Sequence, residues 1–409
     1  MSTTAGRLLR LHHHLALSSR HEQGCSSAAA AAGSSSGGGA AYEEEGALAR
    51  LEQLRSERPD NIAVQSFDRD YYDSLSPELR ARLLACVKSG VENPDSSMGA
   101  YAMQPSDYDD LRPFFRAALS AYHKVPTDAR HHNSWSLGGL RGLPDDGVLD
   151  IAALGLPALS MRVRVGRNLA AFPLPGAMEA EQRRALEGFL QPAFAALIAL
   201  PGYGGRYVSI TPGHPQEISA AEYEELVAKH IMFKDMSADE YLLSAGIASD
   251  WPEGRGCYIS DDEQFIIWVG EEDHLRIVCM ESGTRLDAVF LRLRSALEVV
   301  EGIQGLDFAM SEDYGVVTSC PTNLGTAMRA SVHLALPKLC ADGTETRAKA
   351  IAKPLGLSVR GLGGEHTPIG ADGTVDISPS ARFCITEGQI IADLYQGLAQ
   401  LQAAEAAEA

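Results

Sequence analysis

The stretch FIIWVGEEDHLRIVCM, from Phe265 to Met280, contains two apolar runs around a short polar segment. The runs Phe265 to Val269 and Leu275 to Met280 are rich in branched and aromatic residues, which favour β-strands. Between them, Gly270-Glu271-Glu272-Asp273 has the composition of a turn, so the two runs are predicted to pair as a hairpin. This hairpin carries acidic side chains at its tip.

Neighbouring segments predict a mixture of strands and helices. Val316 to Cys320 and Val332 to Leu336 are predicted strands, and Arg162 and Arg164 alternate on a further one, so that both face the same side. The last helix is predicted to begin with the capping box Thr386 to Gln389. An earlier amphipathic helix is indicated by apolar residues at helical spacing: Leu286, Val289, Phe290, Leu293, Leu297 and Val300.

Helical patterns dominate from Tyr42 to about His123. Ser76 followed by Pro77 is a typical helix start, in which the serine caps the first turn. Gly90 is predicted to end this helix in a left-handed conformation. The apolar face of the helix consists of Leu79, Leu83, Leu84 and Val87.

Residues 1 to 41 are rich in Ala, Ser and Gly, and the low-complexity run from Ser26 to Ala41 cannot bury a core, so disorder is expected. The first 21 residues lack Asp and Glu but carry Arg7, Arg10 and Arg20, which fits an organelle transit peptide. A disordered tail without a targeting role is the alternative. The expected location is the cytoplasm, with the mitochondrion or another organelle as the alternative.

The composition excludes several classes of partner. The balance of 35 basic against 54 acidic residues gives a formal net charge of −19, which repels nucleic acid and anionic membrane surfaces. No apolar run approaches the roughly 20 residues needed to span a bilayer. Seven widely spaced cysteines without a CxxC pair indicate free thiols, not a disulfide framework or a zinc site. Neither a nucleic-acid partner nor a membrane is expected.

Three acidic or thiol-bearing motifs point to one kind of chemistry. Cys320 to Thr326, CPTNLGT, supplies a thiol, while the hairpin tip and Gly364-Glu365-His366-Thr367 supply carboxylates. Carboxylates accept the fixed fork of N–H donors of a guanidinium in pairs. The combination therefore predicts phosphoryl transfer onto a guanidino compound.

Six motifs between about Val64 and Gln402 resemble those of the phosphagen kinases, and within them those of the arginine kinases. In order, they are SGVENPDSSMGAY, SMRVRVGRN, WPEGRG, FIIWVGEEDHLRI, CPTNLGTAMRASVHLALPKL and VRGLGGEHT. The resemblance implies an α+β fold of the guanidino kinase and glutamine synthetase type. A small all-α domain (residues 42–123) sets substrate specificity, and a linker (124–155) leads to the larger phosphotransferase domain (156–403), which has an antiparallel sheet flanked by helices. Residues 404–409 form a tail.

The resemblance also implies roles for four residues near the substrate. Glu272 and Glu365 are expected to hold the guanidinium, and Glu272 is the expected acceptor of its proton. Asp273 is expected to support the site through hydrogen bonds. Cys320 matches the family's reactive cysteine; Thr322 can donate a hydrogen bond to its sulfur, and the substrate guanidinium favours a thiolate that orients the substrate. No covalent intermediate is implied.

Transfer of a γ-phosphoryl group needs positive charge around its equatorial oxygens. By resemblance, five arginines supply that charge, and the loop from Gly361 to Gly373 is expected to close over the nucleotide. The sequence has no GxxxxGK[ST] loop. The implied nucleotide-binding residues are Ser160, Arg162, Arg164, His230, Arg276, Arg329, Ser331, His333, Arg360, Gly363 and Glu365.

Magnesium accompanies ATP in such a reaction, and the sequence contains no dedicated carboxylate cage for it. The metal is therefore expected to be held mainly by phosphates and water. ATP or ADP and one small guanidino compound are the expected ligands, and the chain is expected to be a monomer or a homodimer.

Substrate specificity is expected to lie in the N-terminal domain. SSMGAY, from Ser96 to Tyr101, resembles the arginine kinase specificity loop, while Tyr122 and Glu365 disfavour creatine. Gly363 replaces an arginine that is common in arginine kinases. L-arginine is therefore the first expectation, with taurocyamine or lombricine next and an inactive nucleotide-binding scaffold as a minor alternative. The implied substrate-binding residues are Ser96, Ser97, Met98, Gly99, Tyr101, Tyr122, Glu272, Cys320 and Glu365.

Overall fold

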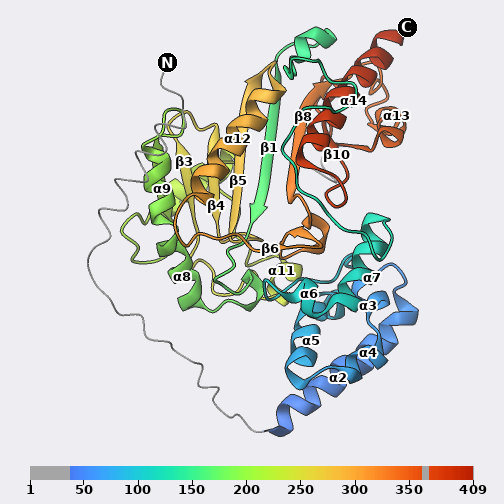
Figure 1. Ribbon diagram of the computed structural model, residues 1–409, viewed down its shortest axis with the longest axis vertical. Coiled ribbons are helices and arrows are strands. Elements are labelled where there is room, and N and C mark those ends of the chain that lie inside the picture. The colour runs from blue at the N-terminus through green and yellow to red at the C-terminus, as the bar shows by residue number, and fades with distance from the viewer. Residues whose placement is uncertain (1–36, 362–367, 409) are drawn as a thin grey trace. The chain divides into compact units, whose positions relative to one another are not determined.

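Figure 1 shows the protein as a computed structural model, which describes residues 37–361 and 368–408. The chain divides into two compact units, Met1–Glu45 and Gly46–Ala409. The first helix, α2 (Gly37–Glu57), begins in the first unit and continues into the second. All other elements described below belong to the second unit.

The start of α2 at Gly37 differs from the expectation that residues 1–41 are disordered. Ala40, Ala41 and the glutamates that follow have high helix propensity, which extends the helix toward the N-terminus. Five further helices complete the N-terminal region: α3 (Ile62–Ser66), α4 (Arg69–Ser74), α5 (Pro77–Glu92), α6 (Asp107–Asp110) and α7 (Arg112–His123).

The helix α5 begins as predicted, with Ser76 as the cap and Pro77 in the first turn. The prediction that it ends at Gly90 is wrong, since the helix continues to Glu92. Gly90 instead allows close packing: its amide donates to the Gly99 carbonyl, and a Cβ on Gly90 would lie 2.7 Å from that oxygen. The absence of a side chain therefore lets α5 approach the backbone at Gly99.

The C-terminal region contains an eight-stranded sheet in the order β2-β3-β4-β5-β1-β8-β10-β9, with antiparallel neighbours throughout. The predicted hairpin is confirmed, since β4 (Phe265–Val269) pairs with β5 (Leu275–Gly283). Arg162 and Arg164 lie on β1 (Leu159–Arg167), as predicted. The other strands are β2 (Gly205–Ser209), β3 (Gly256–Ser260), β8 (Met328–Ala335), β9 (Leu357–Arg360) and β10 (Thr374–Pro379).

The predicted strand from Val316 to Cys320 is wrong. Strand β7 comprises Gly315–Val316 and pairs with β6 (Met310–Ser311) in a small sheet of its own. Beyond β7 the chain turns, because the Ser319 amide donates to the Asp273 carboxylate and the Thr318 hydroxyl donates to the Cys320 carbonyl. These polar contacts outweigh the β-propensity of the valines.

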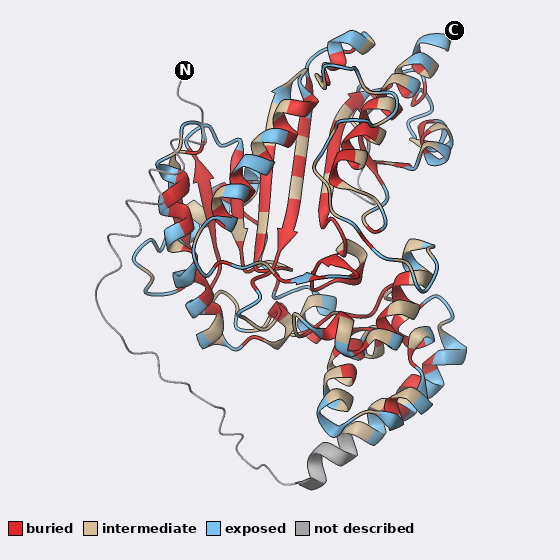
Figure 2. Cartoon of the chain, viewed as in Figure 1, coloured by how far each residue is buried: buried red, intermediate tan, exposed pale blue. Residues whose placement is uncertain are grey.

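Two long helices cover one face of the sheet and form the main core with it (Figure 1). α12 (Leu286–Glu301) packs on β5 and β1, and α14 (Glu387–Ala407) packs on β8 and β10. On β1, Met161, Val163 and Val165 belong to this core, and Figure 2 shows buried residues along the strands of the sheet. The residues between them on β1 point to the opposite face of the sheet.

Thr386 caps α14 as predicted, because its side chain accepts a hydrogen bond from the Gln389 amide at 3.1 Å. The helix reaches Ala407, so residues 404–407 are helical and not a tail. Glu405 anchors this end by accepting two backbone amides from the chain after β8. The remaining helices are α8 (Ala180–Phe189), α9 (Gln191–Ile198), α10 (Ala220–Ala228), α11 (Glu240–Ser244) and α13 (Thr346–Ala352). None of the described helices has the length and apolar character needed to cross a membrane.

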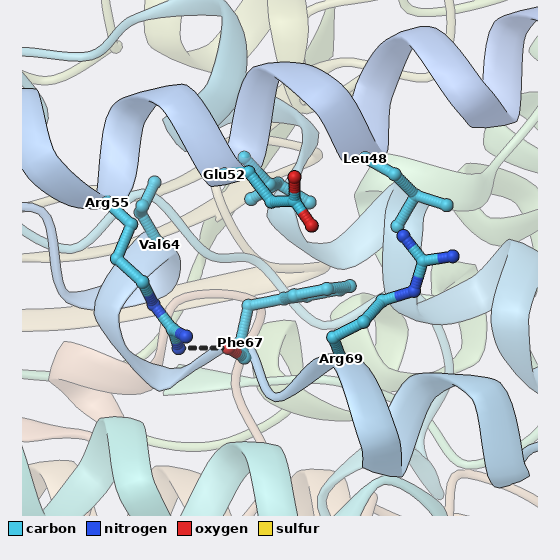
Figure 3. Close-up of a pocket in the computed structure, with 7 residues that line it drawn as sticks. Leu48, Glu52, Arg55, Val64, Phe67 and Arg69 are labelled. Atoms are coloured by element: carbon cyan, nitrogen blue, oxygen red, sulfur yellow. Dashed lines mark hydrogen bonds between the residues drawn. The ribbon is translucent and has the colours of Figure 1, made fainter.

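A small cavity of about 70 Å³ lies in the N-terminal region beside α2 (Figure 3). Arg55 donates a hydrogen bond to the Phe67 carbonyl at 2.5 Å on one side of it. The other lining residues are Leu48, Leu51, Glu52, Val64 and Arg69. The volume is far below the roughly 300 Å³ of small-molecule pockets, so this cavity is a packing feature.

Candidate active site

A much larger cavity, of about 760 Å³, opens on the face of the sheet opposite α12 and α14. Its size is in the range of sites that bind a nucleotide-sized ligand. Eight of the residues predicted to bind nucleotide line it: Ser160, Arg162, Arg164, His230, Arg276, Arg329, Ser331 and His333.

The register of β1 and β8 explains why these residues converge. Ser160 pairs with His333, and Arg162 pairs with Ser331. Two residues further along each strand, Arg164 pairs with Arg329. Paired residues of neighbouring strands point to the same face of a sheet, so the polar residues of both strands line one surface.

The arginines of the cavity repel one another. Burial, together with Arg276 and Arg329, lowers the pKa of Arg162 to about 10, and burial and the neighbouring arginines lower the pKa of Arg164. The Nε atom of Arg162 is buried without a hydrogen-bond partner among the described residues. A phosphate group offsets both costs, because charge-assisted hydrogen bonds to phosphate are strong. The cavity is therefore suited to a polyphosphate.

Asp376 on β10 also lines the cavity, although the sequence reasoning did not single it out. Its carboxylate accepts a hydrogen bond from Arg329 at 2.5 Å and lies 3.9 Å from Nε2 of His333. In the sheet, Asp376 pairs with Arg360 of β9. The carboxylate thus orients Arg329 and stands among residues of three neighbouring strands.

The tip of the β4–β5 hairpin, Glu271 to Asp273, adjoins the cavity. Arg276 donates to Glu271 at 2.7 Å and to Glu272 at 3.2 Å, so one guanidinium holds both carboxylates. Glu272 also accepts a hydrogen bond from Asn323 at 3.4 Å. Burial raises the pKa of Glu272 to about 7 against the opposing charge of Arg276, and the Glu271 carboxylate adds to the increase. Such a pKa suits a group that exchanges protons near neutral pH.

Asp273 connects this tip to the loop that precedes Cys320. Its buried carboxylate accepts hydrogen bonds from the Asn168 side chain at 2.6 Å and from the Ser319 amide at 2.7 Å. Burial raises its pKa, and the two hydrogen bonds oppose that shift. Asn168 in turn accepts the His274 amide at 2.8 Å. Asp273 therefore lies where the sequence predicts a supporting role through hydrogen bonds.

Cys320 is buried near Glu272, and its sulfur lies 3.1 Å from the Thr322 hydroxyl. Burial, followed by the Glu272 carboxylate, raises the pKa of the thiol, while the hydrogen bond with Thr322 lowers it. The groups of the chain itself therefore favour the thiol, in contrast to the expected thiolate. The difference arises because the expectation relied on the positive charge of a substrate guanidinium.

The predicted specificity loop follows α5. The Ser96 hydroxyl accepts the Gly99 amide at 2.9 Å, and the carbonyls of Ser97 and Met98 accept amides from α3. Within the described part of the chain, the amides of Ser97 and Met98 have no hydrogen-bond partner. These two amides are therefore available to an acceptor outside the chain.

The two predicted tyrosines lie in different surroundings. Tyr101 is partly buried, and burial raises the pKa of its hydroxyl. Cys320 and Glu272 raise this pKa further, which means that the three residues are close together. Tyr122 is 40% exposed at the end of α7, with its ring edge against His123. Tyr101 is thus near the candidate guanidino site, whereas Tyr122 lies on the surface of α7.

Glu365 and Gly363 lie outside the described residues, as do residues 362–367 of the expected nucleotide-covering loop as a whole. Arg360, which precedes this loop, ends β9 opposite Asp376.

No three His, Cys, Asp or Glu side chains within residues 44–361 and 368–408 are grouped so that they could hold a metal ion. Glu271 and Asp376, two of the carboxylates that line the cavity, are each bonded to an arginine.

Comparison with known proteins decides the family. A family model described as the C-terminal catalytic domain of ATP:guanido phosphotransferases matches residues 204–408, which include the hairpin tip and Cys320. The chain belongs to this family. It is a phosphagen kinase, a phosphotransferase that acts between ATP and a guanidino group. The predicted family and fold class are confirmed.

Curated arginine kinases are similar over nearly their full length. The arginine kinase Oct f 2 of Amphioctopus fangsiao is 34% identical over 342 residues, which cover 83% of this phosphagen kinase and 92% of the relative. The arginine kinase of Limulus polyphemus is 35% identical over 355 residues, covering 85% and 93%.

Two solved structures that are similar to this chain are named as kinases of guanidino compounds other than arginine. The substrate-free duplicated taurocyamine kinase from Schistosoma mansoni has a TM-score of 0.74 and 31% identity, over 88% of this chain and 49% of that one. This phosphagen kinase therefore spans about half the length of the duplicated enzyme. A lombricine kinase has a TM-score of 0.71 and 25% identity, over 85% of this chain and 92% of that one.

Three polar residues of the site escaped the sequence reasoning. Glu271 and Asn323 lie inside recognised motifs, but a motif does not reveal which side chain an arginine or a carboxylate will contact. Asp376 is a single acidic residue within a strand, and its sequence surroundings give no signal of its contact with Arg329.

Proposed function

We propose that this phosphagen kinase reversibly transfers the γ-phosphoryl group of MgATP to the guanidino group of L-arginine, giving phosphoarginine and ADP. The position of Glu272 is the observation that supports this proposal most directly. This carboxylate is held by Arg276, which lines the large cavity, and it lies near Cys320 and Tyr101. One carboxylate is thus bonded to an arginine of the large cavity and is also close to Cys320 and Tyr101.

In the proposed reaction, the bond between the γ-phosphorus and the bridging oxygen breaks, and the electron pair of that bond leaves with ADP. A terminal guanidino nitrogen forms the new bond to phosphorus and loses one proton. A guanidinium has a pKa above about 12, so this nitrogen becomes nucleophilic only when its proton is accepted. Glu272 accepts the proton, and in the reverse reaction returns it.

The arginines of the cavity hold the phosphates and stabilise the charge of the transferring group. Catalysis of this kind depends mainly on position and electrostatics, because the transition state offers little covalent chemistry for the protein to assist. Arg276 has two tasks, since it faces the cavity and also holds Glu272. Mg²⁺, when bound with ATP, supplies further positive charge to the phosphates.

The specificity loop supports L-arginine as the substrate. The amides of Ser97 and Met98 can donate hydrogen bonds to the α-carboxylate of arginine, and Tyr101, the last residue of this loop, is close to Glu272. Backbone amides are common partners of carboxylates because they add fixed donors without a flexible side chain.

Taurocyamine and lombricine are the alternative substrates. Two of the similar solved structures are a taurocyamine kinase and a lombricine kinase. Taurocyamine carries a sulfonate and lombricine a phosphodiester where arginine carries its carboxylate, and backbone amides also bind those anions.

A substrate panel tests the proposal. The rate of ADP release is measured with MgATP and arginine, taurocyamine, lombricine, glycocyamine or creatine, and arginine is expected to have the highest kcat/KM. A higher kcat/KM for taurocyamine or lombricine would overturn arginine as the substrate. Absence of ADP release with all five compounds would favour the inactive scaffold.

A further inference from the structure

Arg255, directly before β3, is a fully buried cation held by backbone carbonyls. The residue is 0% exposed and donates four hydrogen bonds. Nε donates to Gly270 at 3.1 Å, Nη1 to Glu253 at 2.6 Å, and Nη2 to Ile247 at 2.8 Å and to Ser249 at 3.0 Å. Burial lowers its pKa to about 9, which leaves the guanidinium charged at neutral pH.

The four acceptors belong to two different segments. Ile247, Ser249 and Glu253 lie in the segment that leads to β3, whereas Gly270 lies at the end of β4. A buried charge costs several kcal/mol unless its donors are satisfied. The planar fork of arginine presents five N–H donors spread over three nitrogens, whereas the ammonium of lysine presents three donors on a single nitrogen. The side chain therefore ties the segment before β3 to the β4–β5 hairpin.

Gly270 is the residue at which the chain leaves β4 for the acidic tip. Its φ is +73°, and its amide donates to the His274 carbonyl at 3.0 Å, closing the turn. A Cβ at this position would lie 2.6 Å from the Gly254 carbonyl. The acidic tip therefore begins at a residue that is packed against Gly254 and hydrogen-bonded to Arg255.

The segment before β3 is itself anchored. The buried Glu187 carboxylate accepts hydrogen bonds from the hydroxyls of Tyr207 and Thr211, each at 2.7 Å. Thr211 accepts the Gly254 amide at 2.8 Å. Because Gly254 precedes Arg255, this series of hydrogen bonds fixes the backbone from which the arginine side chain extends. A reacting group is held accurately only when its supports are themselves fixed.

We infer that Arg255 is a positioning residue for phosphoryl transfer: by holding the Gly270 carbonyl, it fixes the acidic tip so that Glu272 meets the guanidino nitrogen. The inference rests on the proposed function of Glu272. Arg276 and Asp273 hold the tip through side-chain contacts, whereas Arg255 holds its backbone at the point where the tip begins.

The test compares Arg255→Lys with Arg183→Lys in the full chain. Arg183 is the control, because it is 2% exposed and also donates to backbone carbonyls, those of Pro175, Met178 and Gly246, as well as to the Asp250 carboxylate at 3.5 Å. None of these four residues belongs to the hairpin. Both substitutions remove hydrogen bonds of a buried arginine, so both should lower the midpoint of thermal unfolding. The distinguishing measurements are kcat and the KM values for the guanidino substrate and for MgATP.

Arg255→Lys is expected to lower kcat by roughly 10²-fold, the loss that a displacement of about 1 Å can cause. Its KM for MgATP should stay close to the wild-type value, because Arg162, Arg164 and Arg329 of the cavity lie on β1 and β8, outside the hairpin. Arg183→Lys should keep kcat and both KM values close to wild type. Equal losses of kcat in the two variants, or wild-type kcat in Arg255→Lys, would overturn the inference.

Two further outcomes are decisive. If Arg255→Lys does not fold, Gly270→Ala is measured in its place, because the added Cβ disturbs the contact between Gly270 and Arg255. A low kcat with an unchanged KM for MgATP in this variant supports the inference. A wild-type kcat overturns it. Absence of guanidino-dependent turnover in the wild-type chain would instead overturn the proposed function, and the inference with it.

Discussion

The guanidinium of Arg276 donates to the Glu272 carboxylate at 3.2 Å, and the same arginine lines the large cavity proposed to bind the nucleotide. One residue therefore joins the two halves of the proposed reaction. A phosphate that shares the positive charge of Arg276 weakens the effect of this arginine on Glu272. A weaker effect raises the proton affinity of the carboxylate, so nucleotide binding favours acceptance of the guanidinium proton.

Glu272→Gln should stabilise the chain more at high than at low pH. The folded-state pKa of Glu272, about 7, exceeds the ordinary value of 4.5, so the folded chain binds more protons between these values. The contribution of Glu272 to stability is therefore lost as the pH rises through this window. Glutamine does not titrate, so the variant does not lose stability as the pH rises through this window. The Tm of both proteins at about pH 5 and about pH 8 measures the effect, and an equal Tm difference at the two pH values would contradict a raised pKa.

Arg162→Met should raise the Tm and weaken nucleotide binding. Burial and neighbouring arginines lower the pKa of Arg162, which means that its charge destabilises the chain. The same charge is expected to contact phosphate, so the affinity for MgADP should fall by roughly tenfold or more, on the scale of one charge-assisted hydrogen bond. Thermal unfolding and a binding titration measure the two effects. A variant that is less stable and binds MgADP normally would indicate a purely structural role.

Cys384 should react with iodoacetamide before Cys320. Among the described cysteines Cys384 is exposed and the others are buried. Burial and Glu272 also raise the pKa of Cys320, which lowers its thiolate fraction. Arginine together with MgADP should slow the labelling of Cys320 and leave that of Cys384 unchanged. Peptide mapping after limited labelling measures both; faster labelling of Cys320 in the free enzyme would mean that its thiolate forms without substrate.

Gly90→Ala should raise the KM for the guanidino substrate and lower stability by about 1–3 kcal/mol, the usual range for overpacking. The new Cβ meets the Gly99 carbonyl at 2.7 Å, so the specificity loop must shift. Gly46→Ala on α2 is the matched control, because a Cβ there has nothing within 4 Å. It should leave the KM unchanged and add up to about 1 kcal/mol through helix propensity. If Gly90→Ala keeps the wild-type KM, the loop does not help to bind the substrate.

The sequence predicted those parts of the fold that local patterns determine. The hairpin from Phe265 to Met280 has an apolar run on each side of a polar turn, and the caps at Ser76 and Thr386 are signalled by residue type. The strand predicted from Val316 failed because its deciding contact, from Ser319, reaches a residue 46 positions away. Long-range polar contacts of this kind leave no periodic pattern in the sequence.

The candidate site could be predicted as a set of residues, through the resemblance of the motifs, but not as a set of contacts. The hydrogen bond from Arg329 to Asp376 depends on the pairing of β8 with β10, which no motif specifies. The protonation state of Cys320 depends on burial, which is a property of the folded chain. Arg255 appeared in a recognised motif, yet its link to Gly270 became visible only in three dimensions.

The most direct test of the central claim, that Glu272 accepts the guanidinium proton, is the kcat of phosphoarginine formation by Glu272→Gln and Glu365→Gln. The amide at position 272 keeps the shape of the side chain but cannot accept the proton, so kcat should fall by roughly 10²-fold or more, the scale of general-base loss. Glu365 is expected to align the substrate and not to accept its proton, so its substitution should lower kcat less, and Glu272→Gln should keep the wild-type KM for MgATP. A loss in Glu365→Gln that equals or exceeds the loss in Glu272→Gln would contradict the account.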